Sequence, residues 1–242
     1  MNNLHAILIE CDNIRSLGES CERDVYNIHK MLITNNVPES NIHILTNNVK
    51  YFSKKNMTTN IYSNSRIVIE NILKILTITE NPIFIHISGH GYQGADVKNI
   101  ELDGRCEQIV LSDGVLRDYE FNTLLKKYIK KTIRLRISVD TCHSGTFSNF
   151  YYKFDTNNKK IPAIKNSTPY FTDACSISAC ADNQLDSCDI GLVGGFGGGL
   201  TSHILDDNNL INFLIGDIIK VKENLLKILR LLSQEPILLV DN

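Results

Sequence analysis

A cysteine and a histidine stand at the ends of two strand-like apolar runs, where together they could perform nucleophilic chemistry. Cys142 lies in the motif DTCHSG, directly after the run 133–139, and His90 lies in the motif SGHG, directly after the run 83–87. In α/β proteins the carboxyl ends of parallel strands meet at one edge of the sheet, where reacting groups and ligands gather. We therefore expect the thiol and the imidazole to lie close together.

A thiol beside an imidazole suits acyl transfer. A free thiol, with a pKa of about 8.5, is mostly protonated at neutral pH, and a nearby imidazole holds it as thiolate or takes its proton during attack. The backbone amides of Gly91 and of Cys142 itself are candidates for the pocket that receives the developing oxyanion. Gly145 would let the chain turn away, so we expect Cys142 to be exposed. These features predict a cysteine peptidase.

Each residue alone has a simpler explanation. A lone cysteine is usually a buried apolar residue, and a lone histidine is usually a hydrogen-bonded one. Their pairing at two strand ends, beside glycines, favours a site instead. His143 adjoins Cys142 in sequence, but neighbouring residues at a strand end point to opposite sides, so we expect His90 to be the base. We expect His86, inside the apolar run, to be buried.

The two motifs resemble those of the metacaspases, in the caspase-like clan of cysteine peptidases (C14). That family has one apolar block before S-G-H-G and a second before D-[ST]-C-H-S-G, and both stand here intact, with 52 residues from histidine to cysteine, about the caspase spacing. Residues 6–11 and 17–25 resemble the family's first strand and its L-x-G-C-x-N-D-A segment, with Ser20 and Arg23 as departures. Looser similarity at 38–46 and 178–184 extends the match. The resemblance implies a caspase-like fold and endopeptidase activity through a Cys-His dyad.

The order of the apolar segments predicts an α/β fold. Strands are expected near 5–11, 41–46, 82–88, 133–140, 172–179 and 236–241, and helices near 22–34, 64–78, 118–130, 199–207 and 214–232. This alternation predicts a mostly parallel central sheet flanked by helices, in a caspase-like three-layer sandwich.

One caspase-like peptidase domain is expected over residues 1–242. The polar, proline-containing stretch from about 148 to 170 predicts a surface loop. In caspase-like enzymes the equivalent segment is a linker between two parts of the domain, here a large-subunit-like part at 1–147 and a small-subunit-like part at 171–242.

Composition sets the expected partners and compartment. The chain has 242 residues, is 43% hydrophobic and has a net charge of −2, which suits one sizeable core and argues against a nucleic-acid partner. No leader-like segment opens it, and charged residues interrupt its longer apolar stretches, so we expect neither secretion nor a membrane partner. Seven cysteines without a C-x-x-C pair indicate reduced thiols in an intracellular, cytoplasm-like compartment. We expect a monomer rather than a dimer.

The resemblance also implies a substrate preference. In the metacaspases acidic side chains select Arg or Lys before the scissile bond, and the matching positions here are Asp24 and Asp140, with Ser88 beside them and Asp182 as a further candidate. Two carboxylates around a guanidinium form charge-assisted hydrogen bonds and disfavour a neutral or acidic side chain. Asp24 and Asp140 have structural alternatives, as a carboxylate at a helix N-terminus and as a loop cap.

The dyad requires no cofactor, but many metacaspases are activated by Ca²⁺ held on carboxylates. The region from Glu101 to Glu107, with Asp113 and Asp118, resembles the source of those ligands, and the candidates are Glu101, Asp103, Asp113 and Asp118. Tyr119 stands where the family commonly has a second consecutive aspartate, and Asn149 where another aspartate ligand is expected. Ca²⁺ takes about six to eight oxygen ligands, so these departures should weaken the site.

Two other functions stay open. A caspase-fold pseudopeptidase acting as an interaction module is opposed by the intact Cys142 and His90. A caspase-like peptidase of other specificity, such as cleavage after Asp, is opposed by the acidic pocket candidates, although Arg23 adjoins Asp24.

Overall fold

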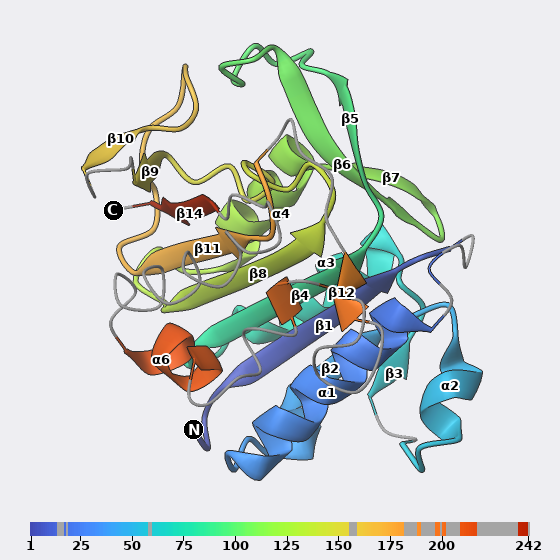
Figure 1. Cartoon of the computed structure of the whole chain (residues 1–242). Helices are drawn as coiled ribbons and strands as arrows, with labels where there is room; N and C mark the ends of the chain where they lie inside the picture. The colour runs from blue at the N-terminus through green and yellow to red at the C-terminus, as the bar shows by residue number, and fades with distance from the viewer. Residues whose placement is uncertain are drawn as a thin grey trace.

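The structure of the protein is a computed structural model that describes residues 1–13, 17, 19–57, 60–154, 159–181, 188–189, 197–198, 200–201, 209–216 and 237–241. Its strands are β1 (His5–Cys11), β2 (Ile42–Leu45), β3 (Ile61–Tyr62), β4 (Ile83–Gly89), β5 (Gly91–Ala95), β6 (Arg105–Leu111), β7 (Gly114–Arg117), β8 (Leu135–Thr141), β9 (Tyr152–Phe154), β10 (Lys160–Pro162), β11 (Ala174–Ser178), β12 (Cys188–Asp189), β13 (Gly197–Gly198) and β14 (Ile237–Val240). Its helices are α1 (Ser20–Thr34), α2 (Val49–Ser53), α3 (Arg66–Leu76), α4 (Asp118–Tyr128) and α6 (Asn209–Ile215), with a 3₁₀ turn at Glu39–Asn41 (Figure 1).

A central sheet organises the molecule. In the part of the chain that the structure describes, nine strands form it, in the order β10-β9-β14-β11-β8-β4-β1-β2-β3. In this spatial order, every pair of neighbouring strands between β11 and β3 is parallel. At the other end of the sheet, β14 pairs antiparallel with β11, β9 with β14, and β10 with β9. The parallel strands therefore deliver their carboxyl ends to one edge of the sheet.

The central strands form because both of their faces are covered. Every residue of β4 and of β8 is buried, which is why these strands appear in the sequence as nearly continuous apolar runs. Successive side chains alternate between the faces. In β4, Ile83, Ile85 and Ile87 belong to one apolar core, and Phe84 belongs to the other.

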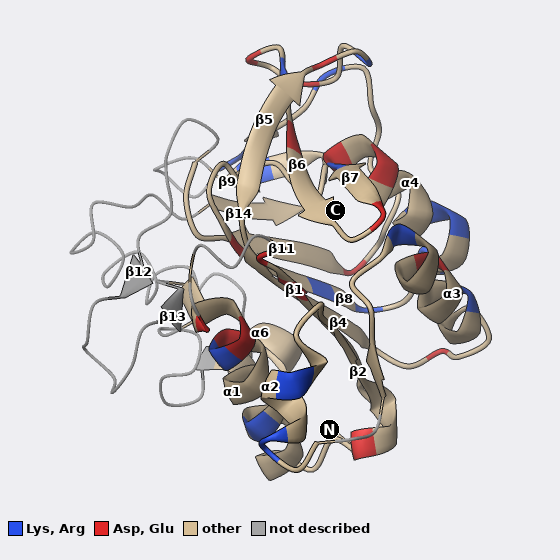
Figure 2. Cartoon of the chain, turned by 90° about the vertical axis from the view of Figure 1, so that its right-hand side faces the viewer, with Lys and Arg blue, Asp and Glu red and all other residues tan. Residues whose placement is uncertain are grey.

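Helices on both faces complete three layers. Figure 2 shows α1, α2 and α6 on one side of the sheet and α3 and α4 on the other. The helix α3 begins where the Ser65 hydroxyl accepts a hydrogen bond from Val68 N at 3.3 Å, a side-chain cap of the helix N-terminus. No helix among the described residues is long and apolar enough to span a membrane.

A second sheet extends the chain directly after His90. It contains β5, β6 and β7 in antiparallel pairing and projects beyond the central sheet (Figure 1). Its first strand begins at Gly91, so the chain leaves the end of β4 and enters this sheet within two residues. The sequence analysis did not predict these strands.

Most of the predicted elements are present. The predicted α/β class is confirmed, as are the strands near 5–11, 41–46, 82–88, 133–140, 172–179 and 236–241 and the helices near 22–34, 64–78 and 118–130. The predicted helices at 199–207 and 214–232 lie largely outside the described residues. The helix α6 falls between them and was not predicted.

The segment from about 148 to 170 contains more structure than a surface loop. Its strands β9 and β10 pair with each other, and β9 pairs with β14. The buried carboxylate of Asp241 accepts hydrogen bonds from the backbone amides of Tyr151, at 3.2 Å, and Tyr170, at 2.7 Å. Both ends of the segment are thereby attached next to β14.

A buried arginine joins β8 to the start of β11. The Arg136 side chain is only 4% exposed; its Nη2 lies 2.7 Å from Asp173 Oδ1, and its Nε donates to Phe213 O at 3.0 Å. Burial alone would raise the pKa of Asp173, but the hydrogen bonds from Arg134 and Arg136 outweigh it and the pKa is lowered. This ion pair secures the strand that carries Cys142.

Replacing Asp173 with Ala should therefore destabilise the protein. Breaking a fully buried ion pair costs about 3–5 kcal/mol. The Asp173 side chain is 36% exposed, so we expect a loss of about 2 kcal/mol in the free energy of unfolding, measured by urea denaturation. Asp103→Ala, at an exposed aspartate, is the control and should unfold like the wild type. Equal stability of Asp173→Ala and the control would contradict this account.

Candidate active site

The carboxyl ends of β4 and β8 bring His90 and Cys142 to adjacent positions. The parallel register pairs Ser88 with Asp140 and Gly89 with Thr141, and the next residue on each strand is the predicted base or nucleophile. The His90 side chain is 23% exposed, and Cys142 is also partly exposed. Both groups therefore face a surface that a substrate can reach.

Cys142 differs from the other cysteines whose exposure is known. Cys11, Cys21, Cys106, Cys175 and Cys180 are all buried. Burial raises the pKa of Cys175 to about 12 and raises that of Cys21 as well, with Cys11 and Asp24 adding to the rise. Cys175 and Cys21 therefore stay protonated at neutral pH, and Cys142 is the partly exposed thiol of this group.

Gly91 packs against the backbone of the predicted nucleophile. A Cβ atom at this position would overlap the Cys142 carbonyl oxygen and would lie 2.7 Å from Thr141 Oγ1. Only glycine fits this approach of β5 to the end of β8. The two predicted oxyanion donors, the amides of Gly91 and Cys142, thus belong to backbone segments in direct contact.

Gly89 permits another close approach, between β1 and β4. Its φ of +149° disfavours other residues, and a Cβ atom there would lie 2.7 Å from the carbonyl carbon of Cys11. His90 N donates to Cys11 O at 3.4 Å. The end of β1 is therefore held beside His90, and Asp12, the next residue, has its Oδ1 3.4 Å from His90 Nε2.

The predicted substrate-binding residues of the described region share one face of the sheet. Asp24 projects from α1, and its Oδ2 accepts a hydrogen bond from Ser88 Oγ at 2.8 Å. Ser88 is paired in register with Asp140, and all three side chains are buried. The structure thus brings Asp24, Ser88 and Asp140 together, as predicted. Asp182 lies outside the described residues.

Asp140 has one satisfied carboxylate oxygen and one that lacks a partner. Its Oδ2 accepts a hydrogen bond from Thr201 N at 2.6 Å, whereas its buried Oδ1 has no hydrogen-bond donor among the described residues. Burial lowers the pKa of the neighbouring His86 to about 4, against the opposing effect of Asp140, so His86 is neutral at physiological pH. The negative charge of Asp140 is therefore not neutralised by this histidine.

A second group of carboxylates lies away from this face. One carboxylate oxygen from each of Glu101, Glu107 and Asp118 lies within 4.8 Å of the others, and all three residues are buried. Thr146 Oγ1 donates to Glu107 at 2.6 Å and to Glu101 at 3.3 Å. Burial raises the pKa of Asp118 to about 6.

The donor types in this group fit a hard cation only in part. Oxygens on opposite sides of a Ca²⁺ ion lie about 5 Å apart, which matches the spacing here, but several lone pairs are already used within the protein. With the Asn149 amide turned so that both of its polar atoms have partners, Nδ2 donates to Glu101 Oε1 at 2.7 Å. The backbone amides of Glu107 and Tyr119 donate to Asp118. Glu101 and Asp118 are thus brought together as predicted, with Glu107 as the third member.

Two predicted calcium ligands lie elsewhere. Asp113 Oδ1 accepts a hydrogen bond from Arg66 N at 2.9 Å, at the first residue of α3, where a carboxylate stabilises the helix N-terminus. Asp103 is exposed and accepts a hydrogen bond from Arg105 N at 2.9 Å in the turn before β6. These positions correct the prediction that Asp113 and Asp103 are calcium ligands.

Comparison with known proteins identifies the family of this chain. Residues 5–151 match the family described as metacaspase, peptidase C14 domain. The chain belongs to the metacaspase family. The matched region contains β1, β4 and β8 together with both sequence motifs.

Individual relatives support this assignment. The chain is 29% identical to metacaspase-1 of Plasmodium falciparum over 172 residues, which are 68% of this chain and 27% of that protein. It is 28% identical to metacaspase-1 of Eremothecium gossypii over 161 residues, 64% of this chain and 34% of that protein. This metacaspase chain therefore spans about a quarter to a third of the length of these relatives.

A solved structure resembles the fold. A Geobacter sulfurreducens protein known from its crystal structure superposes with a TM-score of 0.58 at 21% sequence identity, covering 93% of this chain and 88% of that one. With the family match, it supports a caspase-like α/β architecture for this metacaspase.

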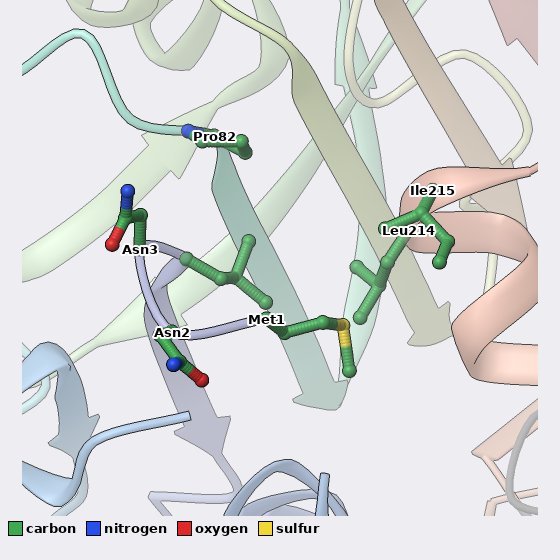
Figure 3. Close-up of a pocket in the computed structure, with 7 residues that line it drawn as sticks. Met1, Asn2, Asn3, Pro82, Leu214 and Ile215 are labelled. Atoms are coloured by element: carbon green, nitrogen blue, oxygen red, sulfur yellow. The ribbon is translucent and has the colours of Figure 1, made fainter. Parts of the chain in front are cut away.

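A separate pocket lies at the opposite edge of the sheet. Residues 1–4, Pro82, Leu214 and Ile215 line a pocket of about 570 Å³ beside the amino ends of β1 and β4 (Figure 3). Its lining side chains are apolar or amides, so they offer no nucleophile or general base. His90 and Cys142 lie at the other edge of the sheet, after the carboxyl ends of β4 and β8.

Sequence reasoning missed three residues around these sites. Asp12 lies beside His90, Thr201 donates to Asp140, and Cys21 lies beside Asp24. Glu107, in the region 101–107 to which the resemblance pointed, joins the carboxylate group. A signal was present for Asp12, because it is the first polar residue after the first strand, in the same position as His90 and Cys142 relative to theirs.

The contact at Gly91 yields a direct test of the site geometry. Gly91→Ala should displace the Cys142 backbone and lower kcat/KM for peptide hydrolysis by about 10²-fold, the effect of losing one oxyanion donor. Gly94→Ala on the same strand is a matched control, because a Cβ there meets only the flexible end of Gln108, at 3.3 Å. Equal activity in the two variants would show that the approach of Gly91 to Cys142 does not matter.

Proposed function

We propose that this chain is a cysteine endopeptidase that cleaves peptide bonds after Arg or Lys through a dyad of Cys142 and His90. The observation that carries the proposal is the unpartnered, buried Oδ1 of Asp140, two residues before Cys142, whose thiol is partly exposed at the end of the same strand. A buried carboxylate oxygen without a donor is unfavourable, so a cationic side chain of the substrate would complete it.

The proposed reaction uses the two strand ends in sequence. His90 takes the proton of Cys142, and the thiolate attacks the carbonyl carbon of the scissile bond. The amides of Gly91 and Cys142 stabilise the oxyanion that forms. His90 then gives its proton to the leaving amine, which leaves a thioester on Cys142. A water molecule hydrolyses the thioester, with His90 again as the base, and frees the new carboxyl terminus.

The proposed specificity rests on the two buried carboxylates of Asp24 and Asp140. Asp24 and Asp140 approach Ser88 from α1 and β8, and the neutral His86 does not balance Asp140. A guanidinium or ammonium group between these carboxylates forms charge-assisted hydrogen bonds, which a neutral side chain cannot make. An acidic side chain would be repelled. Asp182 stays a further candidate for the same pocket.

The alternatives have less support. Cleavage after Asp needs a cation in the pocket, and Arg23 is the candidate next to Asp24. Arg23 instead lies beside the Tyr51 hydroxyl: burial raises the pKa of Tyr51, and the nearby Arg23 charge partly offsets that rise. A pseudopeptidase needs a defective dyad, but both reacting groups are present at neighbouring, partly exposed strand ends. We therefore favour proteolysis over an interaction module.

We further propose a monomer that acts on protein substrates in a reducing, intracellular compartment. Both ends of the described sheet are poor templates for pairing with another copy, because β3 has two residues and β10 has three, one of them Pro162 and one Lys160. A thiol nucleophile is kept in its active form by a reducing environment. The proposal includes neither a nucleic-acid nor a membrane partner.

Calcium enters the proposal only as an activator. Glu101, Glu107 and Asp118 would hold the ion, which would supply positive charge to three buried carboxylates. Thr146, which donates to two of them, lies four residues after Cys142, so the ion would steady the segment that follows the nucleophile. The chemistry at the thiol needs no metal.

The dyad predicts a clear order of activities on a fluorogenic Arg peptide. Cys142→Ala should lose activity by at least about 10³-fold, and His90→Ala should lose about 10²–10⁴-fold, the usual contribution of a general base. His143→Ala is the matched control and should stay close to the wild type. Activity in Cys142→Ala, or a larger loss in His143→Ala than in His90→Ala, would refute the assignment.

The acidic pocket predicts a change of preference. Asp140→Asn and Asp24→Asn should lower kcat/KM for Arg and Lys peptides by about 10²-fold, while hydrolysis of a matched Gln peptide changes little. Thermal melting should show folded variants, and Asp113→Asn, at the start of α3, serves as a carboxylate control. If both pocket variants lose activity on all peptides equally, the acids do not select the substrate.

The calcium proposal can be tested without measuring activity. Millimolar Ca²⁺ should raise the melting temperature of the wild type relative to chelator, because an ion that binds only the folded state stabilises it. Glu107→Gln should remove the shift, and Asp103→Asn should keep it. Identical melting of the wild type in calcium and in chelator would contradict the proposal.

A further inference from the structure

We propose that Asp12 positions His90 by accepting a hydrogen bond from Nε2, which makes Nδ1 the nitrogen that takes the Cys142 proton. This inference rests on the proposed dyad and adds a third residue to it. The main observation behind it is the distance of 3.4 Å between Asp12 Oδ1 and His90 Nε2, which lie at the carboxyl ends of two adjacent parallel strands.

The chemistry of the two groups decides the tautomer. An ionised carboxylate only accepts hydrogen bonds, and a neutral imidazole has one nitrogen that donates and one that accepts. A carboxylate facing Nε2 therefore keeps the ring proton there, and the lone pair is left on Nδ1. Contacts of a general base are commonly long before substrate binds and shorten in the complex.

Asp12 is well held for this role. Its side chain is 2% exposed, its Oδ2 accepts a hydrogen bond from Leu17 N at 2.9 Å, and its backbone amide donates to Glu10 Oε1 at 2.6 Å. The following residue is also fixed, because Asn13 Nδ2 donates to Val110 O at 2.8 Å. A carboxylate with so little freedom can hold the imidazole ring in one orientation.

The close approach at Gly89 places the two strand ends so that this contact can form. Gly89 lies against the Cys11 backbone, and His90 N donates to Cys11 O at 3.4 Å. The residues after Cys11 and after Gly89, which are Asp12 and His90, are thereby neighbours. The Tyr92 ring lies near the His90 imidazole, with the two ring centroids 6.1 Å apart.

The proton balance of the reaction follows from this arrangement. The Cys142 proton moves to Nδ1 while Nε2 keeps its own proton, so a positively charged ring forms between the thiolate and the Asp12 carboxylate. Nδ1 then returns the proton to the leaving amine, and the ring becomes neutral again. Asp12 stays ionised throughout and stabilises the charged ring.

The kinetic test compares two substitutions with a control variant. Asp12→Ala should lower kcat for an Arg peptide by about 10²-fold at unchanged KM, because substrate binding is untouched and the base is misplaced. Asp12→Asn should recover part of that loss, because the amide oxygen can still accept from Nε2 but carries no charge.

Glu120→Gln is the control for these variants. Like Asp12, Glu120 accepts a backbone hydrogen bond, from Arg117 N at 3.1 Å, but it also bonds Arg66 near the start of α4, so kcat should stay close to the wild type. Wild-type kcat in Asp12→Ala would overturn the proposal. So would a loss in Asp12→Asn as large as that in Asp12→Ala.

A second measurement needs neither activity nor substrate. In ¹⁵N-histidine-labelled Cys142→Ala protein, long-range proton–nitrogen correlation should show the neutral His90 ring with its proton on Nε2. Adding Asp12→Asn to that background keeps the Nε2 proton, whereas Asp12→Ala should give a mixture of tautomers. A proton on Nδ1, or one tautomer pattern in all three proteins, would overturn the proposal even if Cys142 and His90 prove to be the dyad.

Discussion

The parallel register of β1, β4 and β8 is the constraint on which the site depends. It sets Ser88 beside Glu10 on one side and Asp140 on the other, and it sets Gly89 beside Cys11 and Thr141. Because the three strands end at the same level, the polar residues that follow them meet without any long loop to position them. A rigid sheet edge of this kind holds reacting groups more firmly than loops would.

Glycine makes the close contacts at this edge possible. Gly89 lets β4 approach the end of β1, and Gly91 lets the chain pass against the end of β8 before it enters the second sheet. Any side chain at either position would push apart the strand ends that carry Asp12, His90 and Cys142. The two glycines of the SGHG motif are therefore geometric requirements of the site.

The sequence predicted well which residues lie at the carboxyl ends of the central strands. Buried parallel strands have a strong apolar signature, and the polar residues that follow them are easy to find. The strand pattern therefore predicted the α/β class, whereas the resemblance to the metacaspases predicted that Asp24, Ser88 and Asp140 meet. No comparable sequence pattern indicated which distant segments contact one another. Glu107 reaches Glu101 and Asp118 through the pairing of β6 with β5 and β7, strands that were not predicted, and Asp113 instead caps α3.

Active-site labelling tests the central claim most directly, because it requires the nucleophile and the acidic pocket to act on the same molecule. Peptidyl chloromethyl ketones that differ only in their last residue would be incubated with the protein, and the adducts would be mapped by mass spectrometry. We predict rapid modification of Cys142 by the Arg and Lys reagents and slow modification by the Leu and Asp reagents. Preferential labelling by the Asp reagent, or an adduct on another cysteine, would contradict the account.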